Sequence, residues 1–399
     1  MKAYHPKSIV LVLFSALMLI SCGDIGGGTS AGGGIGGTGN ISSGPITAFG
    51  SIVVNGTEFD TSNAAIIVDG EEIGIGDDVV LDNLDIGMVI TVYGTGSEDD
   101  GSAVADRVTY NDNVEGPVES ISDRDATTKE IVVLGQTVIV NVITEFRGTT
   151  FDTIALNDVV AVSGLFDDTG AIWATFLEKT DGVVFEVTGF VQNLDTNLET
   201  FDINDLTVNY SLADTSGLLG GVPANGLFVE VEGTLDAGGG EMLATEIELA
   251  DELGVEDADE IEVTGFVTDF ISAFEFTVGN QVVVHTDVDT EFVDGTSQDI
   301  ALGVKLEAEG SLENGILLAE EVEFWGPDQI EVEGLVTNDH LAPDEFTVGT
   351  QVVRTDVDTV FEGGRPEDIL LGVKLEVKGV PVDIDRTIVD ADKVSFEEE

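Results

Sequence analysis

The chain has 399 residues, which exceeds the usual size of one domain and therefore predicts several modules. Its 78 Asp and Glu residues against 14 Lys and Arg give a net charge of −64, which repels phosphate backbones and argues against nucleic-acid binding. Hydrophobic residues make up 42% of the chain, which is enough for packed cores and excludes a wholly disordered protein.

Residues 1–21 predict a lipoprotein signal peptide. Lys2 and Lys7 are followed by an apolar stretch over 9–20, which is too short to span a membrane and is typical of a signal-peptide core. The stretch ends in Leu-Ile-Ser-Cys, and Cys22 is the only cysteine of the chain. This ending resembles the lipobox of bacterial lipoproteins, which implies that Cys22 is lipidated and attaches the protein to a membrane. An ordinary secretory signal with a chance cysteine is the alternative.

The residue after Cys22 bears on where the anchored protein goes. In lipoproteins of this kind, Asp at that position favours retention in the inner membrane, whereas this chain has Gly23. The resemblance therefore implies export to the bacterial cell envelope, with the outer membrane favoured over the inner one. A single cysteine allows no disulfide within the chain, so export is predicted from the signal alone.

Residues 22–43 predict a flexible tether. The stretch 23–44 holds 11 glycines in 22 positions, separated mainly by small polar residues. Such a composition cannot bury enough apolar surface to offset the entropy of ordering the backbone. We expect it to hold the folded part of the protein away from a bilayer.

The remainder of the chain is a repeat. QVVVHTDVDTEF at 281–292 matches QVVRTDVDTVF at 351–361, and DIALGVKLEAEG at 299–310 matches DILLGVKLEVKG at 368–379. Two glycines seven residues apart mark every copy, with Asn157 replacing the first of them once; the pairs are Gly87/Gly94, Asn157/Gly164, Gly226/Gly233, Gly303/Gly310 and Gly372/Gly379. An alanine recurs after each pair, at Ala105, Ala174, Ala244, Ala319 and Ala391. Regular spacing predicts tandem copies of one unit, here modules 1 to 5 at 44–112, 113–181, 182–253, 254–326 and 327–399.

Each module is predicted to be all-β. Apolar residues alternate with Thr, Glu or Lys after the first turn glycine, as at Leu306 and Ala308, which is the pattern of a half-buried strand. Two-residue turn signals mark a hairpin in every copy: Asn55-Gly56, Gly135-Gln136, Asn204-Asp205, Gly279-Asn280 and Gly349-Thr350. In module 4 the pattern predicts five strands, at 261–268, 274–278, 281–286, 304–311 and 315–324. About 70 residues suit a five-stranded, OB-like barrel better than a seven-stranded sandwich. Modules 1 and 3 diverge most from this pattern.

The chain resembles the tandem-repeat bacterial lipoproteins built from a small β-rich domain of unknown function. The resemblance rests on the lipobox, the Gly-rich tether and the repeated pattern Leu-Gly-Val-x-Leu/Val-x-Val/Ala-x-Gly followed by Ala-x-x-Val. It covers nearly all of the chain after Gly44. It implies no activity and no catalytic residues.

Few residues could carry catalysis. His285 and His340 are the only histidines after the signal peptide, and Cys22 is assigned to lipid, so a Cys/His dyad is excluded and an imidazole metal site is not expected. No Gly-x-Ser-x-Gly elbow is present. Trp173 and Trp325 could stack on sugars, but aromatic residues in or beside a strand are more often part of a core or its rim. We therefore predict that the protein is not an enzyme and has no catalytic residues.

One acidic motif, Thr-Asp-Val-Asp-Thr, occurs twice. If the segments were extended, Asp287 and Asp289 would project from one face, as would Asp356 and Asp358, and oxygen ligands on one face suit Ca²⁺. The alternative is a turn in which Asp and Thr side chains bind local backbone groups, and this alternative is favoured.

Two classes of function remain from the sequence. The first is a non-enzymatic, lipid-anchored envelope protein whose β-modules act as a spacer or present a binding surface, with a glycan or an envelope protein as the partner classes left open. The second is a surface adhesin that binds divalent cations or glycans through its acidic faces.

Overall fold

The computed structural model describes residues 40–49, 51–97, 102–250, 253–255, 257–280, 282–342, 344–382 and 386–396. Their regular secondary structure is almost entirely β-strand, which confirms the predicted all-β class. Residues 37–399 form one compact unit. The predicted signal peptide and Cys22 lie outside the described residues, as does most of the predicted tether.

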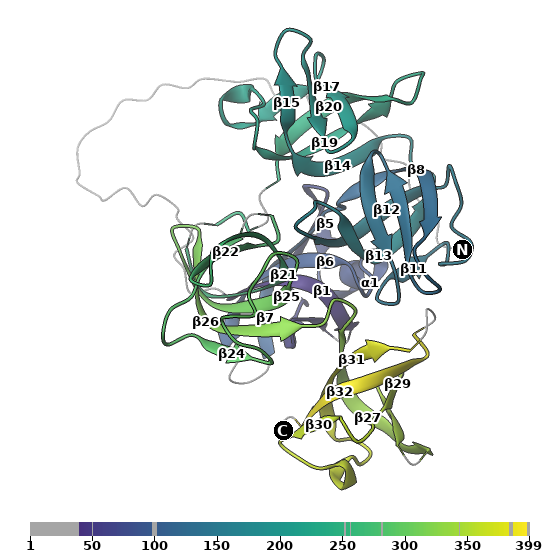
Figure 1. Ribbon diagram of the computed structural model, residues 1–399, viewed down its shortest axis with the longest axis vertical. Coiled ribbons are helices and arrows are strands. Elements are labelled where there is room, and N and C mark those ends of the chain that lie inside the picture. Colours follow the sequence, from purple (N-terminus) through teal and green to yellow (C-terminus); the bar gives the residue numbers. More distant parts are fainter. Residues whose placement is uncertain are drawn as a thin grey trace, which may run out of the picture. The chain divides into compact units, whose positions relative to one another are not determined.

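Modules 4 and 5 share one arrangement of strands (Figure 1). The strands of module 4 are β21 (Ala258–Ser272), β22 (Glu275–Val278), β23 (Val282–His285), β24 (Glu291–Val293), β25 (Lys305–Glu313) and β26 (Ile316–Trp325). Those of module 5 are β27 (Ile330–Ala342), β28 (Glu345–Val348), β29 (Gln351–Arg354), β30 (Val360–Glu362), β31 (Lys374–Pro381) and β32 (Ile388–Phe396), with the 3-10 turn η3 (Pro366–Asp368). The five strands predicted for module 4 are all present, and the short β24 is an addition.

The strands of module 4 close into a ring. β21 pairs with β22, β22 with β23, β23 with β26, β26 with β25, and β25 with β21 again. The third and fifth strands, β23 and β26, run parallel, and the other pairs run antiparallel. This strand order, 1-2-3-5-4-1, with a parallel third and fifth strand, is an OB-like barrel, as predicted. Module 5 repeats it, with β29 parallel to β32.

Modules 1 and 2 close in the same way. Module 1 contains β1 (Asn40–Phe49), β2 (Ile52–Val54), β3 (Thr57–Asp60), β4 (Ala65–Val68), β5 (Glu71–Ile75), β6 (Val89–Ser97) and β7 (Ser102–Tyr110), with the helix α1 (Asp77–Asn83). Module 2 contains β8 (Val114–Asp123), β9 (Lys129–Val133), β10 (Gln136–Val140), β11 (Glu145–Arg147), β12 (Val159–Phe166) and β13 (Ile172–Thr180). The third and fifth strands of the ring are again parallel, β3 with β7 and β10 with β13. Both divergent and regular copies therefore use one topology.

Module 3 keeps this topology with one interruption. It contains β14 (Phe185–Phe190), β15 (Gln192–Asp195), β16 (Thr200–Ile203), β17 (Leu206–Asn209), β18 (Asp214–Gly217), β19 (Phe228–Leu235) and β20 (Glu241–Leu249), with the 3-10 turn η2 (Leu219–Gly221). β14 and β15 together replace the single long first strand of the other modules, with a break at Val191. The ring is therefore continued at Val191 by the covalent backbone between β14 and β15.

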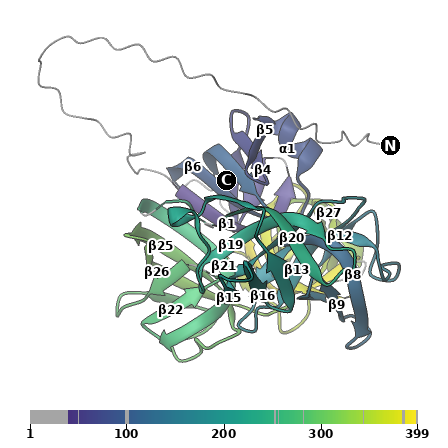
Figure 2. The same cartoon turned by 90° about the horizontal axis from the view of Figure 1, so that it is seen from above.

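Three details differ from the sequence prediction. β1 begins at Asn40, inside the stretch predicted as tether, because 40–45 pairs with β6 and Ile41 is buried. The helix α1 was not predicted; it lies beside β5 in module 1 (Figure 2), and its seven residues are too few for a helical period to show. In module 2 the hairpin turn is Leu134-Gly135, one residue earlier than predicted, with φ of 46° and 69°.

The repeated glycines and alanines meet across one pair of strands. In every module the second glycine lies opposite the repeated alanine, at a bulge between the fourth and fifth strands: Gly94 and Ala105, Gly164 and Ala174, Gly233 and Ala244, Gly310 and Ala319, Gly379 and Ala391. A Cβ atom added at Gly310 would lie 2.0 Å from the backbone oxygen of Leu318. The first position of each pair has φ between 66° and 87°, which explains why Asn157 can replace glycine there.

Replacing Gly310 with Ala is expected to destabilise module 4 by about 1–3 kcal/mol, because the new methyl group overlaps a backbone atom that cannot move away freely. Gly240→Ala is the matched control, since its Cβ would meet no atom within 4 Å. Urea unfolding of the two variants tests the prediction. Equal midpoints would show that the bulge tolerates a side chain.

Candidate functional site

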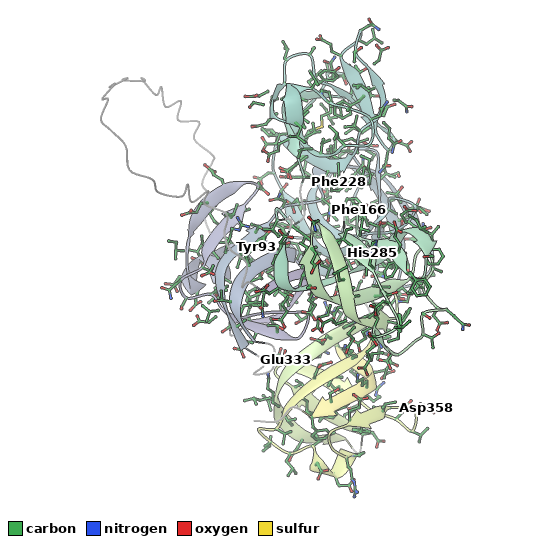
Figure 3. All side chains as sticks on the ribbon, turned by 90° about the vertical axis from the view of Figure 1, so that its left-hand side faces the viewer. Tyr93, Phe166, Phe228, His285, Glu333 and Asp358 are labelled. Carbon is green, nitrogen blue, oxygen red and sulfur yellow. The ribbon has the colours of Figure 1, made fainter. Side chains whose placement is uncertain are left out.

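The predicted metal-ligating residues lie in turns. Asp287 accepts a hydrogen bond from the backbone N–H of Asp289 (2.8 Å), and Asp356 accepts one from the backbone N–H of Asp358 (2.8 Å). The extended conformation that the Ca²⁺ hypothesis required is therefore absent from both segments, and the turn alternative is the one observed. Figure 3 shows Asp358 at the periphery of module 5. Among the described residues, no three His, Cys, Asp or Glu side chains form a group that could hold a metal ion.

The last threonine of the motif explains its repetition. The Thr290 hydroxyl donates to the backbone oxygen of Ala319 (2.8 Å), and Thr359 donates to Ala391 (2.8 Å). In module 2, Thr144 makes the same contact with Ala174 (2.7 Å), although the sequence there reads Asn-Val-Ile-Thr. The motif thus ties the loop after the third strand to the bulge alanine.

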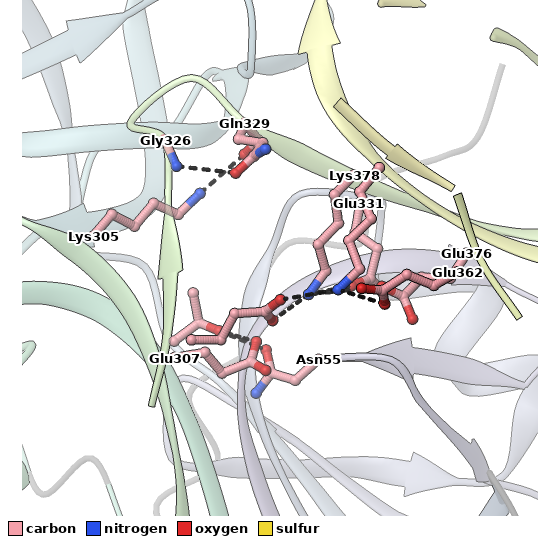
Figure 4. Close-up of polar contacts among 12 residues, drawn as sticks. Asn55, Lys305, Glu307, Gly326, Gln329, Glu331, Glu362, Glu376 and Lys378 are labelled. Atoms are coloured by element: carbon pink, nitrogen blue, oxygen red, sulfur yellow. Dashed lines mark hydrogen bonds and ion pairs between the residues drawn. The ribbon is translucent and has the colours of Figure 1, made fainter. Parts of the chain in front are cut away.

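A network of buried charges lies where module 5 meets module 4 (Figure 4). The ammonium group of Lys378, on β31, forms an ion pair with Glu323 of β26 and lies 4.0 Å from Glu331 of β27. The side chains of Lys378, Glu323 and Glu331 are 9%, 8% and 4% exposed. Lys393 adds contacts to Glu323 (3.7 Å) and Glu362 (3.2 Å).

This environment shifts the pKa of the groups in opposite directions. Burial alone would lower the pKa of Lys378, but the carboxylates of Glu331, Glu307 and Glu323 raise it above its usual value. Burial raises the pKa of Glu331 well above its usual value, with Glu376 adding to the effect. Burial lowers the pKa of Lys305 to about 8. Lys378 therefore stays charged, whereas burial favours the protonated form of Glu331.

The segment that links modules 4 and 5 is held by both. Gln329 accepts a hydrogen bond from the Gly326 N–H (3.0 Å) through its side chain, and donates one to Asp392 (2.9 Å). Its backbone oxygen accepts a hydrogen bond from the Lys305 ammonium group (3.1 Å). The two modules are thus joined by side-chain and backbone contacts on either side of a short linker.

An open cleft of about 770 Å³ lies beside this network. Phe324 and Trp325 line it, and the Trp325 ring has Lys378 4.4 Å from its centroid. Arg354, which also lines the cleft, is paired with Glu345 and Asp390. Four aspartates of the lining form no ion pair with the described Lys and Arg residues: Asp294, Asp356, Asp358 and Asp392. The cleft therefore combines aromatic surface with carboxylates that have no ion pair with a described Lys or Arg.

The other sequence candidates have structural surroundings. Trp173 donates a hydrogen bond to Asp167 (2.9 Å) and packs against Phe266 at 5.5 Å between ring centroids. His285 lies on β23 opposite Glu275 of β22. Trp325 lines the cleft described above, and Trp173 is not among the residues that line it. Sequence reasoning missed Lys378 and its partners, because nothing in one copy indicates that its outer face is covered.

Comparison with known proteins identifies the repeated unit. A family model described as "Domain of unknown function (DUF5666)" matches residues 38–109, 115–178, 182–248, 264–323 and 328–389. No curated protein matches the chain. A solved Drosophila structure, Unr CSD456, aligns with 55% of this chain and 98% of its own at 17% identity and a TM-score of 0.14, which supports no argument about this protein. No helix in the described part is long and apolar enough to cross a membrane.

The five matches correspond to the five barrels described above and together span most of the sequence. The chain therefore belongs to the DUF5666 family, a domain of unknown function, and carries five copies of that domain in tandem.

Proposed function

We propose that this chain is a non-enzymatic, lipid-anchored protein of the bacterial cell envelope, with the outer membrane favoured, and that its modules form a scaffold which spaces or presents a binding surface. One observation carries the scaffold part. Backbone pairing joins separate modules: 40–43 of β1 in module 1 runs parallel to 260–263 of β21 in module 4, and β8 of module 2 pairs with β14 of module 3. Such pairing holds modules in place more firmly than flexible linkers alone would.

Side chains support the same reading. Ser42 of β1 donates to Glu262 of β21 (3.3 Å), and Thr264 contacts Asn55 of module 1 (3.0 Å). The Lys378 network links module 5 to module 4 in a similar way. A protein built only to connect an anchor to a distant domain would not need these contacts. They suit a body that must keep its shape.

The anchor part rests on the sequence around Cys22. Cells fed a clickable fatty acid are expected to label the wild-type protein, and Cys22→Ser should abolish the label and release the protein from the membrane fraction or leave an uncleaved precursor. A wild-type protein that takes up no label would end the lipoprotein proposal. Gly23→Asp, which keeps the cysteine, is the control for sorting and should still be labelled.

A second candidate, a glycan-binding adhesin, is favoured by the cleft beside Trp325. Aromatic surface beside carboxylates that have no ion pair suits a site that stacks and hydrogen-bonds a sugar. On a glycan array, Asp358→Ala should reduce any binding of the full chain. Asp289→Ala is the matched control, because it alters the same motif in module 4 outside the cleft lining. Equal binding by both variants would exclude the cleft.

The divalent-cation form of the adhesin has a separate test. With a net charge of −64, any salt should stabilise the fold by screening repulsion. Ca²⁺ must therefore raise the melting temperature beyond NaCl of equal ionic strength. No difference between the two salts would exclude specific binding.

A further inference from the structure

The outer face of the sheet formed by the first, fourth and fifth strands carries opposite charges in different modules. In module 5, Lys378 precedes the bulge glycine and Lys393 follows the repeated alanine by two residues. At the same two places module 3 has Glu232 and Glu246. The two places that supply lysines to the contact with module 4 are therefore both acidic in module 3.

Glutamates face each other directly on this face of module 3. Glu186 of β14 lies opposite Glu232 of β19, and Glu230 of β19 lies opposite Glu248 of β20. Like charges directly opposite on neighbouring strands destabilise a sheet. Glu186 and Glu230 are nevertheless buried, at 7% and 5% exposed. An acidic face in solvent would be ordinary, whereas a buried one requires an explanation.

The segment 110–113, which connects module 1 to module 2, covers these glutamates. The backbone N–H of Thr188, on β14, donates to the backbone oxygen of Asn113 (2.9 Å). The Asn111 amide donates to Glu230 (3.0 Å), and the Tyr110 hydroxyl donates to Asp112 (2.5 Å). The covering segment thus brings a further carboxyl group, Asp112, to the acidic face.

Acidic side chains outnumber basic ones around the contact of segment 110–113 with module 3. Groups on the surrounding elements interact electrostatically or by hydrogen bonds with Asp112, Glu186 and Glu230. They are Asp69 after β4, Tyr110 on β7, Glu115 on β8, Glu178 on β13, Glu232 on β19 and Glu248 on β20. Arg147 on β11 acts on Tyr110 but is paired with Asp85 and Glu178. None of the described Lys or Arg side chains forms an ion pair with Asp112, Glu186 or Glu230. In the described part of the chain, Oε1 of Glu186 also has no hydrogen-bond partner.

Protonation of these carboxyl groups would remove the repulsion between them. Burial raises the pKa of Glu230 to about 8, with Glu248 adding to the effect. Burial likewise raises the pKa of Glu186 and of Asp112 well above its usual value. A protonated carboxyl group can lie against a neighbouring carboxylate and donate a hydrogen bond to it, whereas two carboxylates repel.

We propose that this contact is a proton-controlled joint, in which segment 110–113 docks on module 3 while Asp112, Glu186 and Glu230 hold protons and separates from it as they ionise. The inference does not depend on the anchor, but it concerns the contact beside the β8–β14 pairing; the pairing of β1 with β21, which the scaffold proposal also uses, is not part of the joint. The two buried contacts therefore neutralise their carboxyl groups differently. Lysine side chains do so where module 5 meets module 4, and protonation does so on module 3.

Hydrogen exchange of the Thr188 amide in the full chain tests the joint, because that amide donates across it. Its protection, corrected for intrinsic exchange, should fall as the pH rises from 5 to 9, by about tenfold for each pH unit over which one carboxyl group ionises. Amides of β31 in module 5 should lose less protection than the Thr188 amide over the same range, because Lys378 and Lys393 supply positive charge to that contact. Constant protection of Thr188 would overturn the proposal.

Two double variants distinguish an effect of the carboxyl groups in the joint from an effect of the net negative charge of the chain. Glu186→Gln with Glu230→Gln mimics the protonated side chains and should keep Thr188 protected at pH 9. Glu71→Gln with Glu72→Gln removes the same charge from exposed positions of β5 and should behave as wild type. Equal rescue by both pairs would attribute the effect to net charge and overturn the proposal. Glu230→Gln alone gives the same comparison if the first pair does not fold.

Discussion

Replacing Lys378 with Met is expected to lower the free energy of unfolding of the full chain by about 3–5 kcal/mol, because it leaves buried carboxylates without their counter-charge. Glu323 and Glu331 would remain in the contact with side chains 8% and 4% exposed. The methionine keeps the length and apolar stem of the lysine, so the loss reports the charge. Urea unfolding followed by the fluorescence of Trp325, whose ring Lys378 contacts, measures it.

Two comparisons make this expectation specific. Arg124→Met removes an ion pair with Glu130 whose side chains are 48% and 36% exposed, and it should change stability by no more than about 1 kcal/mol. Adding Glu323→Leu and Glu331→Leu to Lys378→Met should recover much of the loss, since an apolar replacement of a whole buried network is often neutral. A loss at Lys378 no larger than that at Arg124 would show that solvent reaches the network.

The barrel itself could be predicted from sequence because its signals are local. Alternating residues such as Leu306 and Ala308 mark which face of a strand is inside, and both are buried. The first turn position of each pair requires positive φ, and Asn157 has φ of 66°. Each of these patterns occurs five times, because the unit is repeated five times. Topology then follows from strand number and loop length.

The short elements and the interfaces could not be predicted. β11, β24 and β30 have three residues each, too few for any period to appear. Alternation places Glu186 and Lys378 between the apolar positions of their strands, but it does not indicate that both are buried. Their burial depends on another module packing against these side chains, and no pattern within one copy contains this information.

The Thr-Asp-Val-Asp-Thr motif shows a different limit of prediction from sequence. Its prediction of a cation site depended on an extended conformation for Asp287 and Asp289, whereas a turn puts the first carboxylate on a backbone N–H of its own loop. Asp and Thr residues favour both outcomes. Only the contact between Thr290 and Ala319, distant in sequence, distinguishes them.

The stability of the full chain is expected to fall as the pH rises from about 4.5 to about 8. The carboxyl groups of Glu230, Glu186, Glu331 and Asp112 have a raised pKa in the folded state, so over this range the folded chain binds more protons than the unfolded chain. Their stabilisation is complete below the unfolded pKa and is lost as the pH passes the folded pKa. For Glu230, whose pKa rises from 4.5 to about 8, this amounts to at most about 5 kcal/mol.

Lys305 sets the upper limit of this decline. Its pKa is lowered to about 8 in the folded state, so its burial becomes less unfavourable as the pH rises from there toward 10.5. The free energy of unfolding should therefore pass through a minimum near pH 8. Urea unfolding at intervals from pH 5 to 10 measures the profile, and Glu230→Gln should flatten its lower limb while leaving the upper limb unchanged. A profile that rises between pH 5 and 8 would mean that these carboxyl groups are ionised within the fold and that their neighbours, not protons, stabilise them.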